Sequence, residues 1–212
     1  MLKNKKKWAQ AVIDGLRQEY PQAGTMLKFN SLFELVVAVV LSAQSTDAQV
    51  NQVTERLFAR YNTPGQFAAM DIDELAVLIR GVGLNKGKAR SIQGISRILL
   101  DQYHGQVPED LDVLMQLPGI GRKSANVIRS VGFGLPGLGV DTHVQRVANR
   151  IGLVAEKNPH KTESALKSLL PSQDWSLAHH LLIHHGRQIC KARRPQCEVC
   201  RIADLCEKHI SN

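Results

Sequence analysis

Apolar residues recur every three or four positions along almost the whole chain, which is the spacing of one buried face of an α-helix. Trp8, Val12 and Leu16 form one such series, and Val144 and Val147 belong to another. No segment alternates apolar and polar residues as a half-buried β-strand does. The chain is therefore predicted to be all-α, with about ten helices joined by short links.

Residues that favour helix ends bound these segments. Asp141 is placed to cap a helix, and Gly152 is placed to end it. Ser31 and Glu34 form an S-x-x-E capping box ahead of the apolar run 35–41. Because this run is apolar on every side, it is predicted to be a buried helix, although its valines leave a buried strand as the alternative.

The composition favours a folded, basic protein of one large or two small domains. The 212 residues are 43% hydrophobic, and 27 Lys and Arg against 19 Asp and Glu give a net charge of +8. This charge favours an anionic partner, most commonly nucleic acid. The run 35–41 is far shorter than the ~20 apolar residues that span a bilayer, and no signal-peptide core follows the basic N-terminus. We therefore expect a cytoplasmic protein with no membrane partner.

The segment 117–121 reads Leu-Pro-Gly-Ile-Gly and lies between two predicted helices. Pro118 restricts its own backbone, whereas Gly119 and Gly121 permit a tight turn and leave the amides open to a ligand. Amides at a helix N-terminus bind anions, so Gly119, Gly121 and Arg122 are predicted to bind a phosphate. A plain connection between two helices is the alternative.

Lys123 and Asp141 are the candidate catalytic side chains. Lys123 lies in the first turn of a predicted helix, where the helix dipole and Arg122 disfavour its ammonium form and so favour a nucleophilic free amine. The alternative is an exposed lysine that contacts phosphate. Asp141 lies at a predicted N-cap, where amide hydrogen bonds keep the carboxylate ionised and able to stabilise a cationic sugar. Simple capping is the alternative for Asp141.

All four cysteines lie close together in the C-terminal part of the chain: Cys190, Cys197, Cys200 and Cys206. Clustered thiols in a reducing compartment indicate a metal site rather than disulfides. The spacing matches neither the common zinc patterns nor the common ferredoxin patterns, so it does not identify the metal. Basic residues between the cysteines would offset the charge of a ligated cluster and attract DNA phosphates: Lys191, Arg193, Arg194 and Arg201.

Histidines on the helix predicted over 174–189 are a weaker metal candidate: His179, His180, His184 and His185. Their i, i+4 spacing can bind a metal, but no nearby carboxylate completes a site. We predict structural or solvent-facing roles for them.

Three motifs occur in order along the chain: Leu-Pro-Gly-Ile-Gly-Arg-Lys at 117–123, Val-Asp-Thr-His at 140–143, and the cysteine array C-x6-C-x2-C-x5-C. This ordered combination closely resembles the endonuclease III family of helix-hairpin-helix DNA glycosylases. The resemblance runs from about Ser31 to Cys206 and includes Leu-Ser-Ala-Gln-Ser-Thr-Asp at 41–47.

The resemblance implies roles for individual residues. It implies that Lys123 is the nucleophile, that Asp141 is its catalytic partner, and that the four cysteines hold a structural 4Fe–4S cluster. Gln44 matches the side chain that fills the space left by an extruded nucleotide, and Leu84 matches a wedge between bases. On general grounds alone, Gln44 would be a polar residue at a helix end and Leu84 a buried apolar one. The family usually has an aromatic residue after the wedge, where this chain has Asn85.

The implied activity is that of a DNA N-glycosylase and abasic-site lyase that removes oxidised pyrimidines in base excision repair. The damaged nucleotide flips out, Lys123 attacks C1′ and displaces the base, and the Schiff base then undergoes β-elimination. The implied partner is duplex DNA that contains damaged bases or abasic sites. The protein is expected to act as a monomer and to associate with the bacterial nucleoid.

Two alternatives remain open. An adenine-mismatch DNA glycosylase of the same superfamily would share the cluster and the aspartate, but such proteins usually lack the lysine. A non-catalytic, cluster-bearing DNA-binding protein would share the basic surface and leave abasic DNA uncut.

The resemblance also implies a two-lobed arrangement with a DNA cleft between the lobes. The expected central domain covers residues 25–135 and contains the helix-hairpin-helix motif. Residues 1–24 and 136–212 are expected to form the second domain, which contains the 4Fe–4S cluster.

Overall fold

The computed structural model describes residues 2–208, and all regular structure within this range is helical, with no β-strand. The all-α prediction is confirmed. The chain forms two compact units: Met26–Leu135 is one, and the second joins the chain up to Thr25 with the chain from Pro136 onward. Each unit encloses its own hydrophobic core. Within the described range, no helix has both the length and the apolar character needed to cross a membrane.

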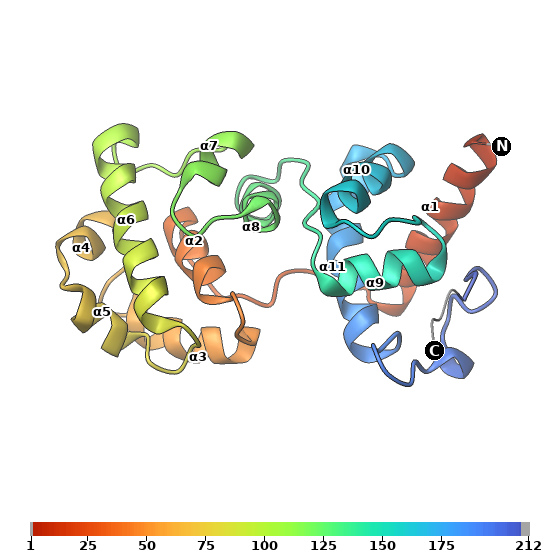
Figure 1. Ribbon diagram of the computed structural model, residues 1–212, viewed down its shortest axis with the longest axis horizontal. Helices are drawn as coiled ribbons and strands as arrows, with labels where there is room; N and C mark the ends of the chain where they lie inside the picture. The colour runs from red at the N-terminus through yellow and green to blue at the C-terminus, as the bar shows by residue number, and fades with distance from the viewer. Residues whose placement is uncertain (1, 209–212) are drawn as a thin grey trace. The chain divides into compact units, whose positions relative to one another are not determined.

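The Met26–Leu135 unit is built around one fully buried helix. Its helices are α2 (Leu32–Leu41), α3 (Asp47–Phe58), α4 (Pro64–Ala69), α5 (Ile72–Leu78), α6 (Asn85–Tyr103), α7 (Leu111–Gln116) and α8 (Arg122–Val127), the last continuing into a π-helical turn at Ile128–Gly132. The run 35–41 lies within α2, which confirms a helix rather than a strand, and every residue from Phe33 to Leu41 is buried. Helices α3, α6 and α8 contact α2, and α4 and α5 lie along α6 (Figure 1).

Side-chain caps fix where these helices begin. Thr46 and Gln49 form a complete capping box at the start of α3, with Thr46 Oγ1 accepting from the Gln49 amide. Ser31 Oγ likewise accepts from the Glu34 amide at 3.2 Å. The Glu34 carboxylate, however, accepts from the amide of Asn30 and not from that of Ser31. The capping box predicted at Ser31 is therefore only half formed, because the Glu34 side chain bonds the amide one residue before the N-cap.

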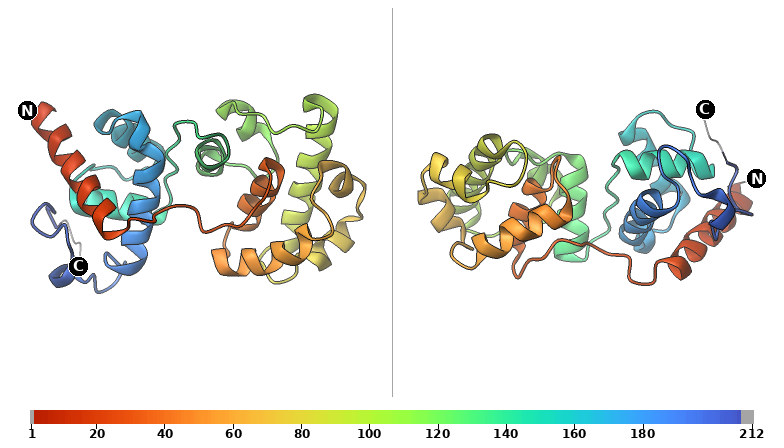
Figure 2. Two further views of the ribbon diagram at one scale, coloured as in Figure 1. Left: turned by 180° about the vertical axis from the view of Figure 1, so that it is seen from behind. Right: turned by 90° about the horizontal axis from the view of Figure 1, so that it is seen from below.

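The second unit brings together helices from both ends of the chain. They are α1 (Leu2–Glu19), α9 (Thr142–Ile151), α10 (Pro159–Leu169) and α11 (Trp175–Gln188), with 3-10 turns at Ser172–Asp174 and Cys197–Val199. Helix α11 packs against both α9 and α1 (Figure 2). Apolar residues of α1, among them Val12 and Leu16, are buried in the same core as Leu181 and Leu182 of α11. Helix α1 is thus an integral part of this unit.

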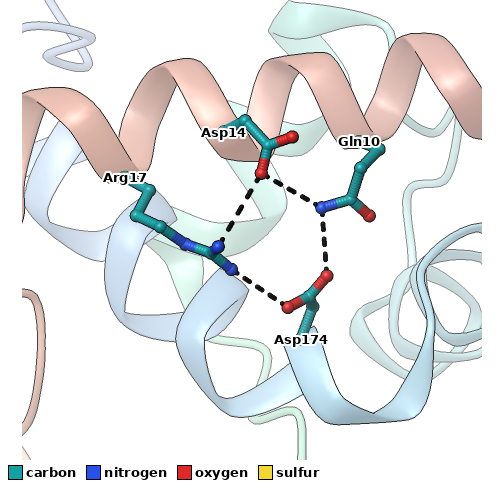
Figure 3. Close-up of polar contacts among 4 residues, drawn as sticks. All are labelled: Gln10, Asp14, Arg17 and Asp174. Carbon is teal, nitrogen blue, oxygen red and sulfur yellow. Dashed lines mark hydrogen bonds and ion pairs between the residues drawn. The ribbon is translucent and has the colours of Figure 1, made fainter.

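A polar network joins α1 to the start of α11 (Figure 3). The Asp174 carboxylate accepts hydrogen bonds from Gln10 Nε2 and from Arg17 Nη2, each at 3.1 Å. Gln10 also donates to Asp14, which lies 3.9 Å from Arg17 Nη1. Asp174 is only 9% exposed, so these partners replace the water that its charge would otherwise bind.

Candidate functional site

The hairpin 117–121 connects α7 to α8 through a turn that requires glycine. Gly119 has a φ of +78°, and a Cβ at this position would lie 2.8 Å from Ser91 Oγ. A Cβ on Gly121 would meet no described atom within 4 Å, so the backbone there is open to approach. Gly121 is the N-cap of α8 and brings no side chain to the first turn. This geometry lets an anion approach the start of α8.

Lys123 is an exposed side chain in the first turn of α8. The preceding Arg122 is half-buried, and the following turn of the helix is buried from Ala125 onward. The amine of Lys123 is therefore attached to a rigid element but extends into solvent, at the positive end of the helix dipole.

Asp141 is the N-cap of α9, as predicted. Its Oδ1 atom accepts hydrogen bonds from the amides of His143 and Val144, both at 2.8 Å. Oδ2 makes no hydrogen bond within the described range, and the side chain is half-buried, so this oxygen can interact with a ligand. Asp141 belongs to the second unit and Lys123 to the Met26–Leu135 unit.

Arg146 and Arg150 of α9 connect the Asp141 helix to the segment that follows α11. Arg146 Nη2 donates to the carbonyl of Gly186 at 2.9 Å and contacts His143 Nδ1 at 3.2 Å. Arg150 donates to the carbonyls of Lys191 and Ala192 at 2.6 and 2.8 Å. Burial lowers the pKa of His143, the Asp141 carboxylate raises it, and the charge of Arg146 lowers it.

Gln44 and Leu84 occupy two turns of the Met26–Leu135 unit that touch each other. Both residues have left-handed backbone conformations, with φ of 53° and 59°, and both are exposed. The Ser45 hydroxyl accepts a hydrogen bond from the Gly83 amide at 3.3 Å, which joins the two turns. Leu84 is 62% exposed, so the alternative of a buried apolar residue is wrong. An exposed leucine in a left-handed conformation is costly, and such strain is common at functional sites.

Asn85 follows Leu84 at the place where the family usually has an aromatic residue. Its side-chain amide donates to the carbonyl of Ala76 at 3.0 Å, and its Oδ1 accepts from the Lys86 amide. Asn85 therefore fixes the start of α6 against α5.

The four cysteines are all free thiols and all half-buried. Burial raises the pKa of the Cys200 thiol, and the charges of Cys206, Cys190 and Cys197 raise it further, so the four sulfurs lie within electrostatic reach of one another. Around them, Arg150 Nη1 lies 3.9 Å from Cys190 Sγ, and the Lys208 amide donates to Cys206 Sγ. As thiolates these four sulfurs would repel one another, and a bound cationic group would offset that repulsion.

The four sulfurs have the ligand type and number that an iron–sulfur cluster takes, since a 4Fe–4S cluster is held by four thiolates. A structural zinc site can also be made of four thiolates, so the donor set by itself fits both.

The histidines of α11 make contacts with the protein. His179 Nδ1 lies 2.6 Å from the carbonyl of Gly139. His185 contacts Tyr20 through Nδ1 at 3.1 Å and Cys200 through Nε2 at 3.6 Å. The pKa of His180 is lowered to about 3 by burial and by the neighbouring His179 and His184, so this imidazole is neutral at physiological pH.

Lys88 of α6 contacts the turn that contains Gln44, and it is not among the residues singled out from the sequence. It is 5% exposed, and its ammonium donates to the carbonyl of Leu41 at 2.8 Å and to Ser45 Oγ at 3.1 Å. The sequence does contain a signal, because Lys88 falls on the same helical face as Ile92 and Leu99. A lysine in an apolar series indicates a buried amine with specific partners.

Two family profiles match the chain. Residues 37–172 match the HhH-GPD superfamily base excision DNA repair protein family. Residues 190–206, which span all four cysteines, match the iron–sulfur binding domain of endonuclease III.

Known proteins are similar to this chain over nearly its full length. Endonuclease III of Bacillus subtilis is 45% identical over 92% of this chain and 90% of its own, and the Escherichia coli K12 protein is 43% identical over 92% and 93%. A solved structure of a trapped endonuclease III–DNA covalent intermediate is 45% identical, with a TM-score of 0.91 over 96% of each chain. The chain therefore belongs to the HhH-GPD superfamily of base excision DNA repair proteins and, within it, to the endonuclease III family.

Proposed function

We propose that this chain is a bifunctional DNA glycosylase and abasic-site lyase for oxidised pyrimidines, with Lys123 as its nucleophile. The observation that carries the proposal is an exposed lysine directly after a glycine hairpin, at the start of α8. A similar protein has been trapped as a covalent intermediate with DNA, and such an intermediate requires a nucleophile. An amine on a rigid helix start can reach the sugar of an extruded nucleotide.

DNA binding depends on backbone contacts that do not read the sequence. Gly119, Gly121 and Arg122 bind a phosphate at the start of α8, because helix N-termini and their amides attract anions. Exposed basic side chains of the cysteine segment add long-range attraction for the duplex: Lys191, Arg193 and Arg194. Gln44 and Leu84 enter the duplex, where they replace the extruded nucleotide and separate neighbouring bases.

The chemistry begins when the free amine of Lys123 attacks C1′. A C–N bond forms, the bond from C1′ to the base breaks, and the base leaves with a proton. Asp141 stabilises the positive charge that develops on the sugar. Opening of the sugar ring gives a Schiff base, which acidifies the C2′ protons. Loss of one such proton expels the 3′ phosphate, and hydrolysis of the Schiff base then releases Lys123.

The iron–sulfur cluster has a structural role in this proposal. Cys190, Cys197, Cys200 and Cys206 would hold it, and when bound it supplies covalent links across a segment that has no regular structure apart from one short 3-10 turn within residues 190–208. Arg150 would orient the segment through the carbonyls of Lys191 and Ala192.

Borohydride trapping tests the nucleophile. With a duplex that contains one oxidised pyrimidine, the wild-type protein is expected to form a covalent adduct, and Lys123→Ala is expected to form none while it still binds the DNA. Lys161→Ala, which removes an exposed lysine of α10, is the matched control and should trap normally. A normal adduct yield from Lys123→Ala would remove Lys123 from this role.

A substrate panel separates the two alternative functions. An adenine-mismatch glycosylase would release adenine and leave oxidised pyrimidines in place. A non-catalytic DNA-binding protein would leave abasic DNA uncut, whereas the proposed lyase cuts it even with EDTA present. Since the substrate is chromosomal DNA, the proposal also places the protein at the nucleoid.

A further inference from the structure

The C-terminus of α2 and the N-terminus of α6 meet at a single buried ammonium group. Leu41 is the last residue of α2, and its carbonyl is one of the four that have no partner within the helix. Lys88 Nζ donates to this carbonyl at 2.8 Å. A cation at the negative end of a helix dipole is favourable, and here it also satisfies an acceptor that would otherwise be buried without a bond.

The same ammonium binds the turn that contains Gln44. Lys88 Nζ lies 3.1 Å from Ser45 Oγ, and this hydroxyl also accepts the hydrogen bond from the Gly83 amide at 3.3 Å. Gly83 directly precedes Leu84, and a Cβ on Gly83 would lie 3.5 Å from the carbonyl oxygen of Gln44. One side chain therefore contacts both turns, directly on one side and through a single hydroxyl on the other.

The burial of Lys88 indicates a specific role. Burial lowers its pKa, and within the described range its partners are one carbonyl and one hydroxyl, with no carboxylate to offset the loss of water. A methionine or leucine at this position would fill the same space at lower cost. What the lysine adds is a pair of directed hydrogen bonds that hold two left-handed turns in place.

We infer that Lys88 is a positioning residue that holds the Gln44 and Leu84 turns in one fixed arrangement, so that both side chains enter the duplex together. This inference rests on the proposed function, because it assigns DNA insertion to Gln44 and Leu84. It adds a residue that need not touch the DNA and that acts through Ser45 and the end of α2.

The test compares Lys88→Met with Lys86→Met in the cluster-loaded, full-length protein. Lys86 is on the same helix and is largely exposed, and among the residues that the structure describes its one ion pair is with the exposed Asp73, so its variant removes the same charge without the two directed bonds. The probe is a duplex with 2-aminopurine beside an uncleavable abasic analogue, because its fluorescence rises when the neighbouring base is unstacked. At saturating protein, Lys88→Met is expected to lose at least half of this rise, and Lys86→Met is expected to keep it.

Kinetics provide the second readout. Misplaced groups cost up to about 100-fold in rate, so single-turnover release of an oxidised pyrimidine should fall about 10- to 100-fold in Lys88→Met. Cleavage of a natural abasic site should fall less than about threefold, because no base has to be displaced there. A merely destabilised protein would lose both activities in proportion.

Two outcomes overturn the inference. One is a folded Lys88→Met protein whose fluorescence rise and base release both stay within about twofold of wild type. If Lys88→Met does not fold, Ser45→Ala decides, since it removes the hydroxyl that Lys88 and Gly83 share, and an unchanged fluorescence rise again rejects the inference. Failure of the proposed function is recognised separately, because the wild-type protein itself would then form no borohydride adduct.

Discussion

The Asp141 carboxylate accepts a 2.8 Å hydrogen bond from the amide of Val144, which ties a charged group to the first turn of α9. The capping role of Asp141 can therefore be tested apart from its proposed chemical role, by a substitution that keeps this bond and removes the charge. Asparagine caps helices about as well as aspartate, but it cannot stabilise a cationic sugar by charge. Asp141→Asn is therefore expected to slow base release at least about 100-fold with little change in stability or DNA affinity.

Asp141→Ala is the companion variant. It removes the cap as well, so it should lose about 1 kcal/mol of stability in addition to activity. Single-turnover kinetics and urea unfolding measure the two effects, and wild-type turnover in Asp141→Asn would exclude the catalytic role.

Leu84 offers a test in which activity and stability change in opposite directions. Its side chain is 62% exposed and its φ is 59°. Leu84→Gly should slow base release by removing the wedge, yet should stabilise the protein by up to about 1 kcal/mol because glycine accepts this backbone conformation without strain. Leu84→Ala should lose the same activity without the gain in stability. Equal thermal midpoints for the two variants would argue against strain at this position.

Arg150 is predicted to control retention of the iron–sulfur cluster. Arg150→Met removes charge-assisted hydrogen bonds to the carbonyls of Lys191 and Ala192, so the segment that begins at Cys190 loses its anchor to α9. We expect a purified protein with less than half of the wild-type iron and sulfide and a weaker visible absorbance.

Arg193→Met is the matched control for Arg150→Met. Arg193 is exposed in the same segment, so its loss should keep the iron but weaken DNA binding and lower the salt dependence of affinity by about one phosphate contact. Equal iron contents in the two variants would refute the anchoring role of Arg150.

His180 makes stability depend on pH. Burial, together with His179 and His184, lowers the pKa of His180 from 6.5 to about 3. Between these two values the unfolded chain binds a proton that the folded protein does not, so stability falls as pH falls through this window. In His180→Gln the free energy of unfolding should fall less steeply as the pH falls, by up to about 1.4 kcal/mol per pH unit. Urea unfolding at pH 6.5 and 5 measures the slope, and parallel slopes for the two proteins would contradict the assignment.

Asp174 anchors α1, and its removal should be far more costly than that of Asp14. Asp174→Asn replaces an acceptor of two hydrogen bonds, from Gln10 and Arg17, with an amide that also presents donors to them. We expect a loss of about 1–2 kcal/mol, against about 0.5 kcal/mol or less for Asp14→Asn, whose carboxylate is half exposed. Thermal melts of the two variants test this difference, and equal midpoints would show that the network is not needed.

Helix limits could be predicted because they depend on local chemistry. Asp141 caps α9, and Gly152 ends it with a φ of 97°, both where the sequence places them. The apolar run 35–41 is likewise a buried helix, since a capping residue precedes it and no alternating segment elsewhere in the sequence could pair with it as a strand.

The hydrogen-bond partners of Lys88 and the exposure of Leu84 could not be predicted in the same way. The environment of Lys88 is created by Leu41 and Ser45, more than forty positions earlier in the chain, and apolar spacing carries no information about such contacts. The exposure of Leu84 depends on a left-handed turn that leucine does not favour by itself. The cysteine spacing also does not identify the metal. The choice between a zinc ion and an iron–sulfur cluster depends on whether the sulfurs converge on one point, which is a property of the folded segment.

The second unit is made of two segments that lie far apart in the chain, and this affects how the chain folds during synthesis. Helix α1 leaves the ribosome before the Met26–Leu135 unit, but the Leu181 and Leu182 side chains that help to bury its apolar face are translated after that unit. At about 5–20 residues per second, α1 stays without its partners for on the order of ten seconds while Met26–Leu135 folds as a continuous segment. Nascent chains stalled before α11 should therefore display a protease-resistant centre and a protease-sensitive leading helix.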